Sequence, residues 1–261
     1  MDSLLDFSHK TILITGATGG FGQLLAQGLA QRGANLLLSD LNEDKLNKLI
    51  ESLSEFNGKF HSLVADVSIE QDHIKLCAKA LELFGRLDIA INNAGISQPT
   101  KPLHTMLDTD FDAQIKVNLN SVFYGMKHQL LTMLNTSSKQ SAGGHILNVS
   151  SIAGTEAAPT VAGYSAAKHG VIGLSKTAAV EYAKHNIRVN AVCPFLSPTP
   201  LVTDGFGEHY EAASKQIAKR CPMGRLGEPE EMVNAMILMC SPANTFLNGQ
   251  VLLIDGGVSA Y

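Results

Sequence analysis

The sequence predicts a doubly wound α/β fold, in which a seven-stranded parallel sheet carries helices on both faces. Short runs rich in β-branched and aliphatic residues alternate along the chain with longer stretches of helical period. Such alternation specifies parallel strands joined by helical crossovers. No repeat of the 20–50 residues typical of repeat proteins and no Pro/Gly/Ser-rich linker divides the chain. One domain over residues 1–261 is therefore expected.

The strands and helices are expected in strict alternation. The strands are the β-rich runs at 11–15, 35–39, 60–65, 87–91, 145–149, 187–192 and 250–254. The helices are the stretches of helical period at 21–31, 43–56, 69–84, 110–134, 162–184 and 229–240. Gly33 and Gly85 follow the first and third helices, where a left-handed C-cap favours glycine. The small polar residues of 135–144 predict an exposed loop. Segment 195–222 is rich in Pro, Gly and aromatic residues without a clean period, which predicts a mobile lid.

Composition argues against several classes of function. The chain is 45% hydrophobic and 17% charged, with a formal net charge of −4 and no Trp. This argues against a nucleic-acid surface and against a polybasic membrane patch. Residues 1–10 do not resemble a signal peptide, and no apolar run is long enough to cross a bilayer. The four cysteines and nine histidines are scattered, which favours free thiols over disulfides or a metal site and predicts a cytoplasmic protein.

A glycine-rich turn, TGATGGFG, directly follows the first strand at residues 15–22. Its glycines permit a tight turn and let backbone N–H groups approach a pyrophosphate at the start of the next helix. No Gly-Lys-Ser/Thr follows, which argues against a triphosphate-binding P-loop. A glycine-rich turn alone is weak support for a nucleotide site. The flanking strand and helix strengthen it.

Asp40 ends the second strand, where a carboxylate can accept hydrogen bonds from both ribose hydroxyls of an adenosine and repel a 2′-phosphate. Leu41 follows it, and no basic residue in the turn would bind that phosphate. The cofactor expected is therefore NAD rather than NADP, although Asp40 could instead be the N-cap of the next helix. Asp66, followed by Val67, could face the adenine or cap the helix after it. Asn93, Ala94 and Gly95 end the fourth strand, where small residues admit a cofactor and Asn can brace neighbouring strands.

Tyr164 and Lys168 lie four residues apart, so both side chains project from one face of a helix. An ammonium beside a phenol favours the phenolate and is expected to lower the pKa of Tyr164. That change makes tyrosine a proton donor and acceptor near neutral pH. Ser151 closes the fifth strand, so its hydroxyl can meet the phenol in the crevice at the carboxyl ends of the strands. Asn118 lies within a predicted helix, where Asn is unfavourable and invites a hydrogen-bonding explanation.

Together these motifs resemble the short-chain dehydrogenase/reductase family over practically the whole chain, in order and in spacing. The matching residues are Thr15-Gly-x-x-x-Gly-x-Gly22, Asn92-Asn-Ala-Gly95, Asn118, Ser151, Tyr164-x-x-x-Lys168 and Asp255-Gly256-Gly257. The resemblance implies a Rossmann-type fold, hydride transfer between a nicotinamide and a secondary alcohol or ketone, and a homotetramer. It also implies that no metal takes part.

The resemblance implies a role for each catalytic residue. Tyr164 would be the acid/base and Ser151 would hold the substrate oxygen. Lys168 would lower the pKa of Tyr164 and bind the nicotinamide ribose. Asn118, through its backbone and a water, would link Lys168 to solvent. The residues expected around the cofactor are Gly16, Thr18, Gly20, Phe21, Gly22, Asp40, Leu41, Asp66, Val67, Asn93, Ala94, Gly95, Tyr164, Lys168, Pro194 and Thr199, with Asn93 near the nicotinamide ribose and Thr199 near the carboxamide.

Phe195 departs from the family pattern, which usually has Pro-Gly after the sixth strand. Phenylalanine adopts the positive-φ conformations of glycine only at a cost, so either the loop differs or its conformation suits Phe. The ring would wall the substrate site or pack under the nicotinamide, and a solely structural role is equally compatible. Ser151, Tyr164 and Phe195 are expected to touch the substrate. Further pocket residues expected from the topology are Gln98, Ile152, Glu156, Ala157, Val161, Leu196, Leu201, Val202 and Phe206, most of them apolar.

Two alternatives to an NAD-dependent alcohol dehydrogenase or ketone reductase stay open. A 3-oxoacyl-thioester reductase has the same motifs, but its relatives commonly prefer NADPH, and Asp40 with Leu41 counts against that cofactor. A catalytically silent NAD-binding sensor or scaffold would share the fold. The intact set of Asn118, Ser151, Tyr164 and Lys168 argues against a silent protein, which need not keep those residue types.

Overall fold

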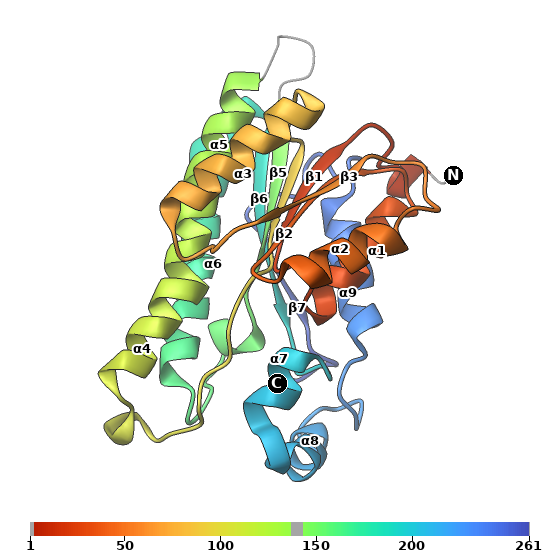
Figure 1. Ribbon diagram of the computed structural model, residues 1–261. Helices are drawn as coiled ribbons and strands as arrows, with labels where there is room; N and C mark the ends of the chain where they lie inside the picture. Colours follow the sequence, from red (N-terminus) through yellow and green to blue (C-terminus); the bar gives the residue numbers. More distant parts are fainter. Residues whose placement is uncertain (1–2, 137–142, 261) are drawn as a thin grey trace.

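The computed structural model describes residues 3–136 and 143–260. Within them, seven parallel strands form one sheet in the order β3-β2-β1-β4-β5-β6-β7 (Figure 1). The strands are β1 (Thr11–Thr15), β2 (Asn35–Asp40), β3 (Phe60–Val64), β4 (Ile89–Asn92), β5 (Gly144–Val149), β6 (Ile187–Pro194) and β7 (Val251–Ile254). This confirms the predicted seven-stranded Rossmann-type sheet. The strand order reverses between β1 and β4, which opens a crevice at their carboxyl ends.

Helices cover both faces of the sheet, as Figure 1 shows. They are α1 (Gly20–Ala30), α2 (Glu43–Ser52), α3 (Glu70–Phe84), α4 (Asp108–Ile115), α5 (Ser121–Thr136), α6 (Ala162–Tyr182), α7 (Pro200–Phe206), α8 (Tyr210–Ala218) and α9 (Pro229–Cys240). Helices α1, α2 and α9 pack with one face of the sheet in the larger apolar core. Helices α3, α5 and α6 pack with the other face in a second core.

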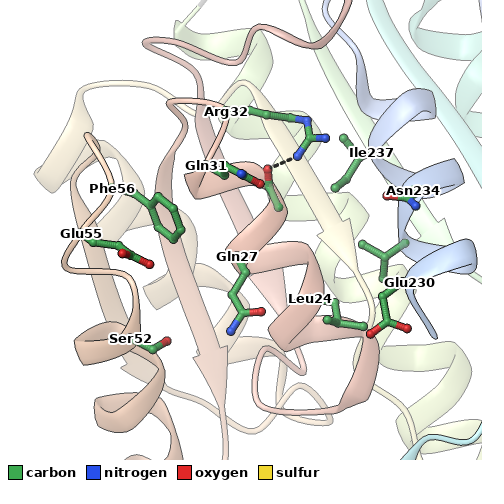
Figure 2. Close-up of a pocket in the computed structure, with 12 residues that line it drawn as sticks. Leu24, Gln27, Gln31, Arg32, Ser52, Glu55, Phe56, Glu230, Asn234 and Ile237 are labelled. Atoms are coloured by element: carbon green, nitrogen blue, oxygen red, sulfur yellow. Dashed lines mark hydrogen bonds between the residues drawn. The ribbon is translucent and has the colours of Figure 1, made fainter. Parts of the chain in front are cut away.

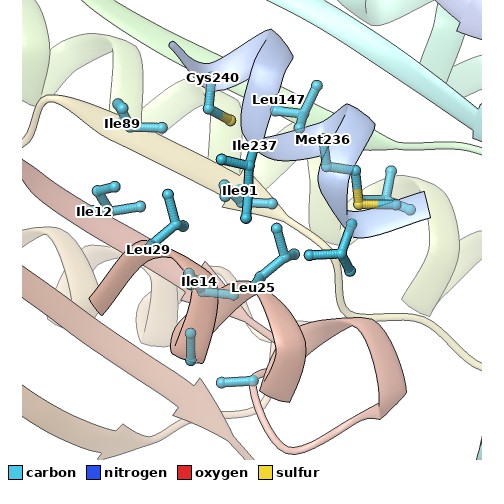
Figure 3. Packing of buried hydrophobic residues seen from close by; sticks show 14 of the residues in the cluster. Ile12, Ile14, Leu25, Leu29, Ile89, Ile91, Leu147, Met236, Ile237 and Cys240 are labelled. Carbon is cyan, nitrogen blue, oxygen red and sulfur yellow. The ribbon is translucent and has the colours of Figure 1, made fainter. Parts of the chain in front are cut away.

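Close packing between α1 and α9 holds the larger core together (Figure 3). Leu25 and Leu29 of α1 lie beside Ile237 of α9, all of them almost fully buried. A Cβ built on Gly28 would lie 2.6 Å from Cδ1 of Ile237, so the two helices cross closely at this glycine. Because close packing leaves α1 little room to shift, it fixes the position of the glycine-rich turn that opens this helix.

Several helix and strand bounds differ from the prediction. Helix α2 ends at Ser52 instead of 56, and β4 spans Ile89–Asn92 instead of 87–91. The predicted helix 110–134 is two helices, α4 and α5, joined by a π-helical turn over Lys116–Asn120. Gly33 and Gly85 have φ of 84° and 72°, which confirms the expected left-handed caps. Of the predicted loop 135–144, residues 137–142 lie outside the described residues.

The segment 195–222 contains the two short helices α7 and α8, which the sequence did not predict. They have 7 and 9 residues and are joined by a 3₁₀ turn over Gly207–His209, in which Gly207 has a φ of 50°. Helices this short show too few turns for a helical period to stand out. They lie beside the carboxyl end of the sheet, and the mobility of this segment stays a prediction. Among the described residues, none of the helices combines the length and the apolar character needed to span a membrane.

Candidate active site

A cleft of about 1150 Å³ lies at the carboxyl ends of the strands. It begins at Asp40 after β2, passes the glycine-rich turn after β1, and ends at Ser151, Tyr164 and Phe195. Apart from Gly22, all of the predicted catalytic, cofactor and substrate residues line it. The parallel sheet brings them together because all of its strands end at one edge. The hollow in Figure 2, about 490 Å³ between α1, α2 and α9, contains none of them.

The glycine-rich turn forms a cradle that side chains would fill. Gly16 has a φ of 63°, and a Cβ there would lie 2.7 Å from Cα of Ala94. A Cβ on Gly20 would lie 2.8 Å from Cγ2 of Thr199. Asn93 braces this cradle, because its Nδ2 donates to the carbonyl oxygens of Thr15 at 3.1 Å and Gly16 at 3.0 Å. Exposed backbone at a helix N-terminus fits a pyrophosphate.

Gly22 lies behind the cradle instead of facing the cleft. A Cβ there would lie 2.1 Å from the carbonyl oxygen of Gly16 and 2.8 Å from backbone atoms of Ala17. This glycine is needed for the packing of α1 against the turn, which is the third glycine's part in a dinucleotide fold. Its expected place around the cofactor is therefore indirect.

The carboxylate of Asp40 is held by backbone donors at the far end of the cleft. Its Oδ2 accepts from Thr18 N at 3.0 Å, and its Oδ1 accepts from Leu41 N at 2.8 Å. The alternative that Asp40 caps α2 is wrong, because Asn42 is the N-cap and accepts from Lys45 N at 2.9 Å. The side chain of Leu41 is 68% exposed beside it.

Asp66 and Val67 also line this end of the cleft. The Oδ1 of Asp66 accepts from Ser68 N at 2.8 Å, so its carboxylate shapes the turn before α3. Residue 69 is the N-cap of α3, and no side chain caps that helix. Asp66 therefore both shapes the turn before α3 and lines the cleft.

Tyr164 and Lys168 lie on one face of α6, as their spacing predicts. Lys168 is 4% exposed, and its Nζ lies 5.6 Å from the centroid of the Tyr164 ring. Its Nζ donates to the carbonyl oxygen of Val149 at 2.8 Å. The Ser150 hydroxyl donates to the carbonyl oxygen of Lys168 at 2.8 Å, which fastens α6 to the end of β5. Ser151 hydrogen-bonds the Tyr164 side chain, so the two hydroxyls meet as expected.

The expected lowering of the Tyr164 pKa is wrong. Burial raises the pKa of Tyr164, and the hydrogen bond with Ser151 only partly offsets that. Burial also lowers the pKa of Lys168 to about 8, because its ammonium is removed from water. Desolvation disfavours both the phenolate of Tyr164 and the ammonium of Lys168. This cost outweighs the attraction expected between the two charges one helical turn apart. The depth of this burial is set by the whole fold and cannot be read from the spacing of the two residues.

Asn118 lies in the π-helical turn and is 0% exposed. Its Oδ1 accepts from Ile96 N at 3.0 Å, and its Nδ2 donates to the Ile96 carbonyl oxygen at 3.0 Å. The side chain therefore holds the backbone of the loop after β4. A π-helical turn widens the helix and leaves its backbone groups less completely paired, and such turns are frequent at functional sites.

Phe195 adopts a conformation that phenylalanine tolerates. Among the described residues other than glycine, positive φ occurs at His9, Thr160 and Asn186. The backbone N of Phe195 donates to the Ile254 carbonyl oxygen at 2.9 Å, which continues the pairing of β6 with β7. Its side chain is 8% exposed, packs in the larger core and lines the cleft. The ring is thus both a core residue and a wall of the cleft.

The nine further pocket residues expected from topology all line the same cleft. Sequence reasoning missed Lys45, which lines the cleft at the Asp40 end. Arg220 of the lid, a basic residue that leaves an anionic substrate open from the sequence, lines it too. Cys193, one residue before the end of β6, is buried nearby, and burial raises the pKa of its thiol, so the thiol stays neutral. Among the described residues, no group of three or more His, Cys, Asp or Glu is arranged to hold a metal.

Comparison with known proteins agrees with this geometry. Residues 16–259 match a family model described as enoyl-(acyl carrier protein) reductase. The chain is 35% identical over 254 residues to a cyclohexanol dehydrogenase of Acinetobacter sp. (strain SE19), covering 97% of this chain and 96% of that one. It is 36% identical over 250 residues to a 3-oxoacyl-(acyl-carrier-protein) reductase of Thermotoga maritima, covering 95% and 97%.

Among solved structures, that of a levodione reductase superimposes with a TM-score of 0.91 at 33% identity. The match covers 97% of this chain and 99% of that one. The family model and the relatives each extend over nearly the full chain, so the resemblance seen in the motifs is confirmed. The chain therefore belongs to the short-chain dehydrogenase/reductase family of oxidoreductases, which bind a nicotinamide cofactor.

Proposed function

We propose that this protein is an NAD-dependent oxidoreductase that interconverts an uncharged secondary alcohol and its ketone. One observation carries the proposal. Ser151, Tyr164 and Lys168 meet at one end of a cleft whose other end holds the carboxylate of Asp40. A dinucleotide whose adenosine lay at Asp40 would extend along the glycine-rich cradle toward Tyr164.

In alcohol oxidation, Ser151 orients the substrate by a hydrogen bond to its oxygen. Tyr164, as the phenolate, takes the hydroxyl proton while the C–H bond of the carbinol carbon breaks and the C=O bond forms. A nicotinamide, when bound, would supply the hydride acceptor for this oxidation. Lys168 would hold its ribose and stabilise the negative charge of the tyrosine. The proton on Tyr164 returns to solvent along a path that the Asn118 backbone and Lys168 support.

The preference for NAD is proposed from Asp40 and Leu41. A fixed carboxylate accepts ribose hydroxyls and repels a 2′-phosphate. The exposed Leu41 offers that phosphate no charge. Lys45 lines the same end of the cleft, and its positive charge acts in the opposite direction, in favour of NADP.

The substrate is proposed to be a ring or chain of mainly apolar character. Ile152, Val161, Phe195, Leu196 and Val202 line the reactive end, and such a wall suits an uncharged ligand. The names of two relatives, cyclohexanol dehydrogenase and levodione reductase, are in keeping with a cyclic alcohol or ketone.

A second candidate is a 3-oxoacyl-thioester reductase. The Thermotoga maritima relative carries that activity in its name, and Arg220 at the lid could meet an anionic carrier. A third, a catalytically silent NAD-binding sensor or scaffold, would bind the dinucleotide without turnover.

An absorbance screen for NADH formation and consumption separates these candidates. It covers cyclic and linear secondary alcohols, diols, hydroxy acids, steroids, ketones and a 3-oxoacyl thioester, each with NAD(H) and NADP(H). Turnover of uncharged alcohols or ketones with NAD(H) supports the proposal. Turnover confined to the thioester with NADPH supports the second candidate, and dinucleotide binding without turnover of any substrate supports the third.

We further propose a cytoplasmic homotetramer. The four cysteines are free and buried, in keeping with a reducing compartment. Exposed apolar side chains lie on the helices and strand that family members use for assembly: Phe111, Phe123, Leu131, Val180, Leu238 and Leu252. Sedimentation at equilibrium tests the assembly, and a monomer at micromolar concentration would contradict it.

A further inference from the structure

The first turn of α6, the helix that carries Tyr164 and Lys168, is capped from a distant part of the chain. The residue before the helix, Val161, has no polar side chain to cap it. Instead, the Oε1 of Gln98 accepts from the backbone N of Tyr164 at 2.7 Å. The first N–H groups of a helix have no partner within it, so this bond satisfies one of them. Gln98 is 5% exposed, and its bond is therefore shielded from water.

The loop that carries Gln98 is itself held by the helix opposite. The side chain of Asn118 bonds both backbone groups of Ile96: it accepts from the Ile96 N–H and donates to the Ile96 carbonyl oxygen. Gln114, one turn before Asn118, donates its Nε2 to the Ser97 carbonyl oxygen at 2.9 Å. Its Oε1 accepts from Nδ2 of Asn118 at 2.6 Å. A continuous set of hydrogen bonds therefore runs from α4 and the π-helical turn through residues 96–98 to Tyr164.

The contact between this loop and α6 is tight. A Cβ on Gly163 would lie 3.2 Å from Oε1 of Gln98 and 3.3 Å from Cγ of Gln114. The chain enters α6 through Thr160, which has a φ of 70°, and Lys101 N donates to its carbonyl oxygen at 2.9 Å. A left-handed conformation at Thr persists only where its surroundings fix it. The entry to α6 is thus fixed by the loop after β4.

We propose that Gln98 is a positioning residue, which sets the phenol of Tyr164 against Ser151 and Lys168 by fixing the first turn of α6. The inference rests on the proposed function. Gln98 acts through the backbone of Tyr164 and donates no proton to the substrate. The hydrogen bond with Ser151 lowers the Tyr164 pKa, so loosening the helix start weakens that bond and raises the pKa. Alcohol oxidation needs the phenolate, and its pH profile then moves to higher pH.

The test compares Gln98→Met, which keeps the side-chain length but cannot accept the bond, with Gln98→Glu, which still accepts it. Asn42→Ala is the matched control, because it removes the N-cap of α2 and no bond to α6. Cofactor is saturating throughout. We expect Gln98→Met to lower kcat for oxidation about tenfold or more with little change in KM. Its pH profile should move to higher pH by about half a unit or more. Gln98→Glu should restore part of kcat, since it keeps an acceptor at the helix N-terminus but loses the Nε2 contacts with the carbonyl oxygens of Pro99 and Thr160.

Amide hydrogen exchange tests the same hydrogen bond, from Tyr164 N to Gln98, independently of catalysis. The Tyr164 amide should lose protection in Gln98→Met and regain it in Gln98→Glu, and Asn42→Ala should leave it unchanged. If Gln98→Met does not fold, Gln114→Met tests the same path, because it releases Ser97 and should move the profile in the same direction.

An active wild type whose pH profile moves in neither methionine variant overturns the positioning role alone. A wild type that binds NADH but turns over no alcohol or ketone overturns the proposed function, and the positioning role with it. Equal loss of kcat in Gln98→Met and Asn42→Ala would assign Gln98 a merely structural role.

Discussion

Lys168 lies over the ring of Tyr164, with Nζ 5.6 Å from the ring centroid, while its hydrogen bond goes to the Val149 carbonyl oxygen. The amine is therefore fixed to the end of β5 and faces the ring instead of being free to follow the phenol oxygen. Both side chains are removed from water, which raises the pKa of Tyr164 and lowers that of Lys168 to about 8. The proposed phenolate of Tyr164 must therefore form against the cost of this burial.

Removing the phenol oxygen tests the acid/base assignment. Tyr164→Phe should lower kcat by about 10² to 10⁴, the usual contribution of general acid–base catalysis. Binding of NADH, measured by its fluorescence, should persist, because the ring and the cleft remain. Tyr182→Phe, on the same helix and packed against the second core, is the control and should retain activity. Turnover by Tyr164→Phe at the wild-type rate would refute the role.

Ser151 should influence the pH dependence of the proposed oxidation. Its hydrogen bond lowers the pKa of Tyr164, so Ser151→Ala should raise that pKa further. Oxidation requires the phenolate, which is present above the Tyr164 pKa. The rising limb of log kcat against pH should therefore move to higher pH in Ser151→Ala, while ketone reduction, which uses the phenol, is favoured at lower pH. A profile that moves to lower pH would show that this hydrogen bond does not stabilise the phenolate.

Asp40 and Leu41 should set the cofactor preference. Asp40→Asn removes the charge and keeps an acceptor for Thr18 N, but its amide nitrogen cannot accept from Leu41 N as the second carboxylate oxygen does. Combined with Leu41→Arg, it should raise the ratio of kcat/KM for NADP to that for NAD by about tenfold or more, since each 1.4 kcal/mol is tenfold. Steady-state kinetics with both cofactors measures the ratio. An unchanged ratio would place the adenosine ribose elsewhere.

Gly22 and Gly173 should respond oppositely to alanine. A Cβ on Gly22 would lie 2.1 Å from backbone oxygen, which cannot move aside, so Gly22→Ala should cost about 1–3 kcal/mol and weaken NADH binding. Gly173 lies within α6, and a methyl group there would meet nothing within 4 Å, so Gly173→Ala should stabilise by about 0.5–1 kcal/mol. Urea unfolding measures the change in the free energy of unfolding of each variant. If both variants were destabilised equally, the close contacts around Gly22 would not explain the effect.

His145 should make the protein sensitive to mild acid. It is buried at the start of β5, and burial holds its pKa well below 6.5. The stability contributed by the neutral ring is complete above about pH 6.5 and is lost as pH falls toward the folded pKa. His145→Leu loses the bond from Asn190 and should be less stable at pH 7. Between about pH 6.5 and 5, the Tm of His145→Leu should fall less than the Tm of the wild type. An equal fall in both proteins would be evidence against a role of His145 in acid sensitivity.

Sequence alone determined the seven strands, the alternating helices and the edge of the sheet at which the reactive residues meet. These follow from local periodicity and from the rule that parallel strands end at one edge. Tyr164 and Lys168 were placed on one face of a helix by their spacing of four, and the glycines of residues 15–22 by the turn they require. Such features depend on residues close together in the chain, so they can be predicted from the order of residues in the sequence.

Only the tertiary structure decided the sign of the Tyr164 pKa shift and the origin of the cap on α6. Burial depends on every element packed around a side chain, and spacing cannot measure it. Gln98 reaches Tyr164 from 66 residues away, and no local pattern announces such a bond. The side chain of Asn118 in the π-helical turn likewise bonds Ile96, 22 residues away, and the helices α7 and α8 are too short to show a period.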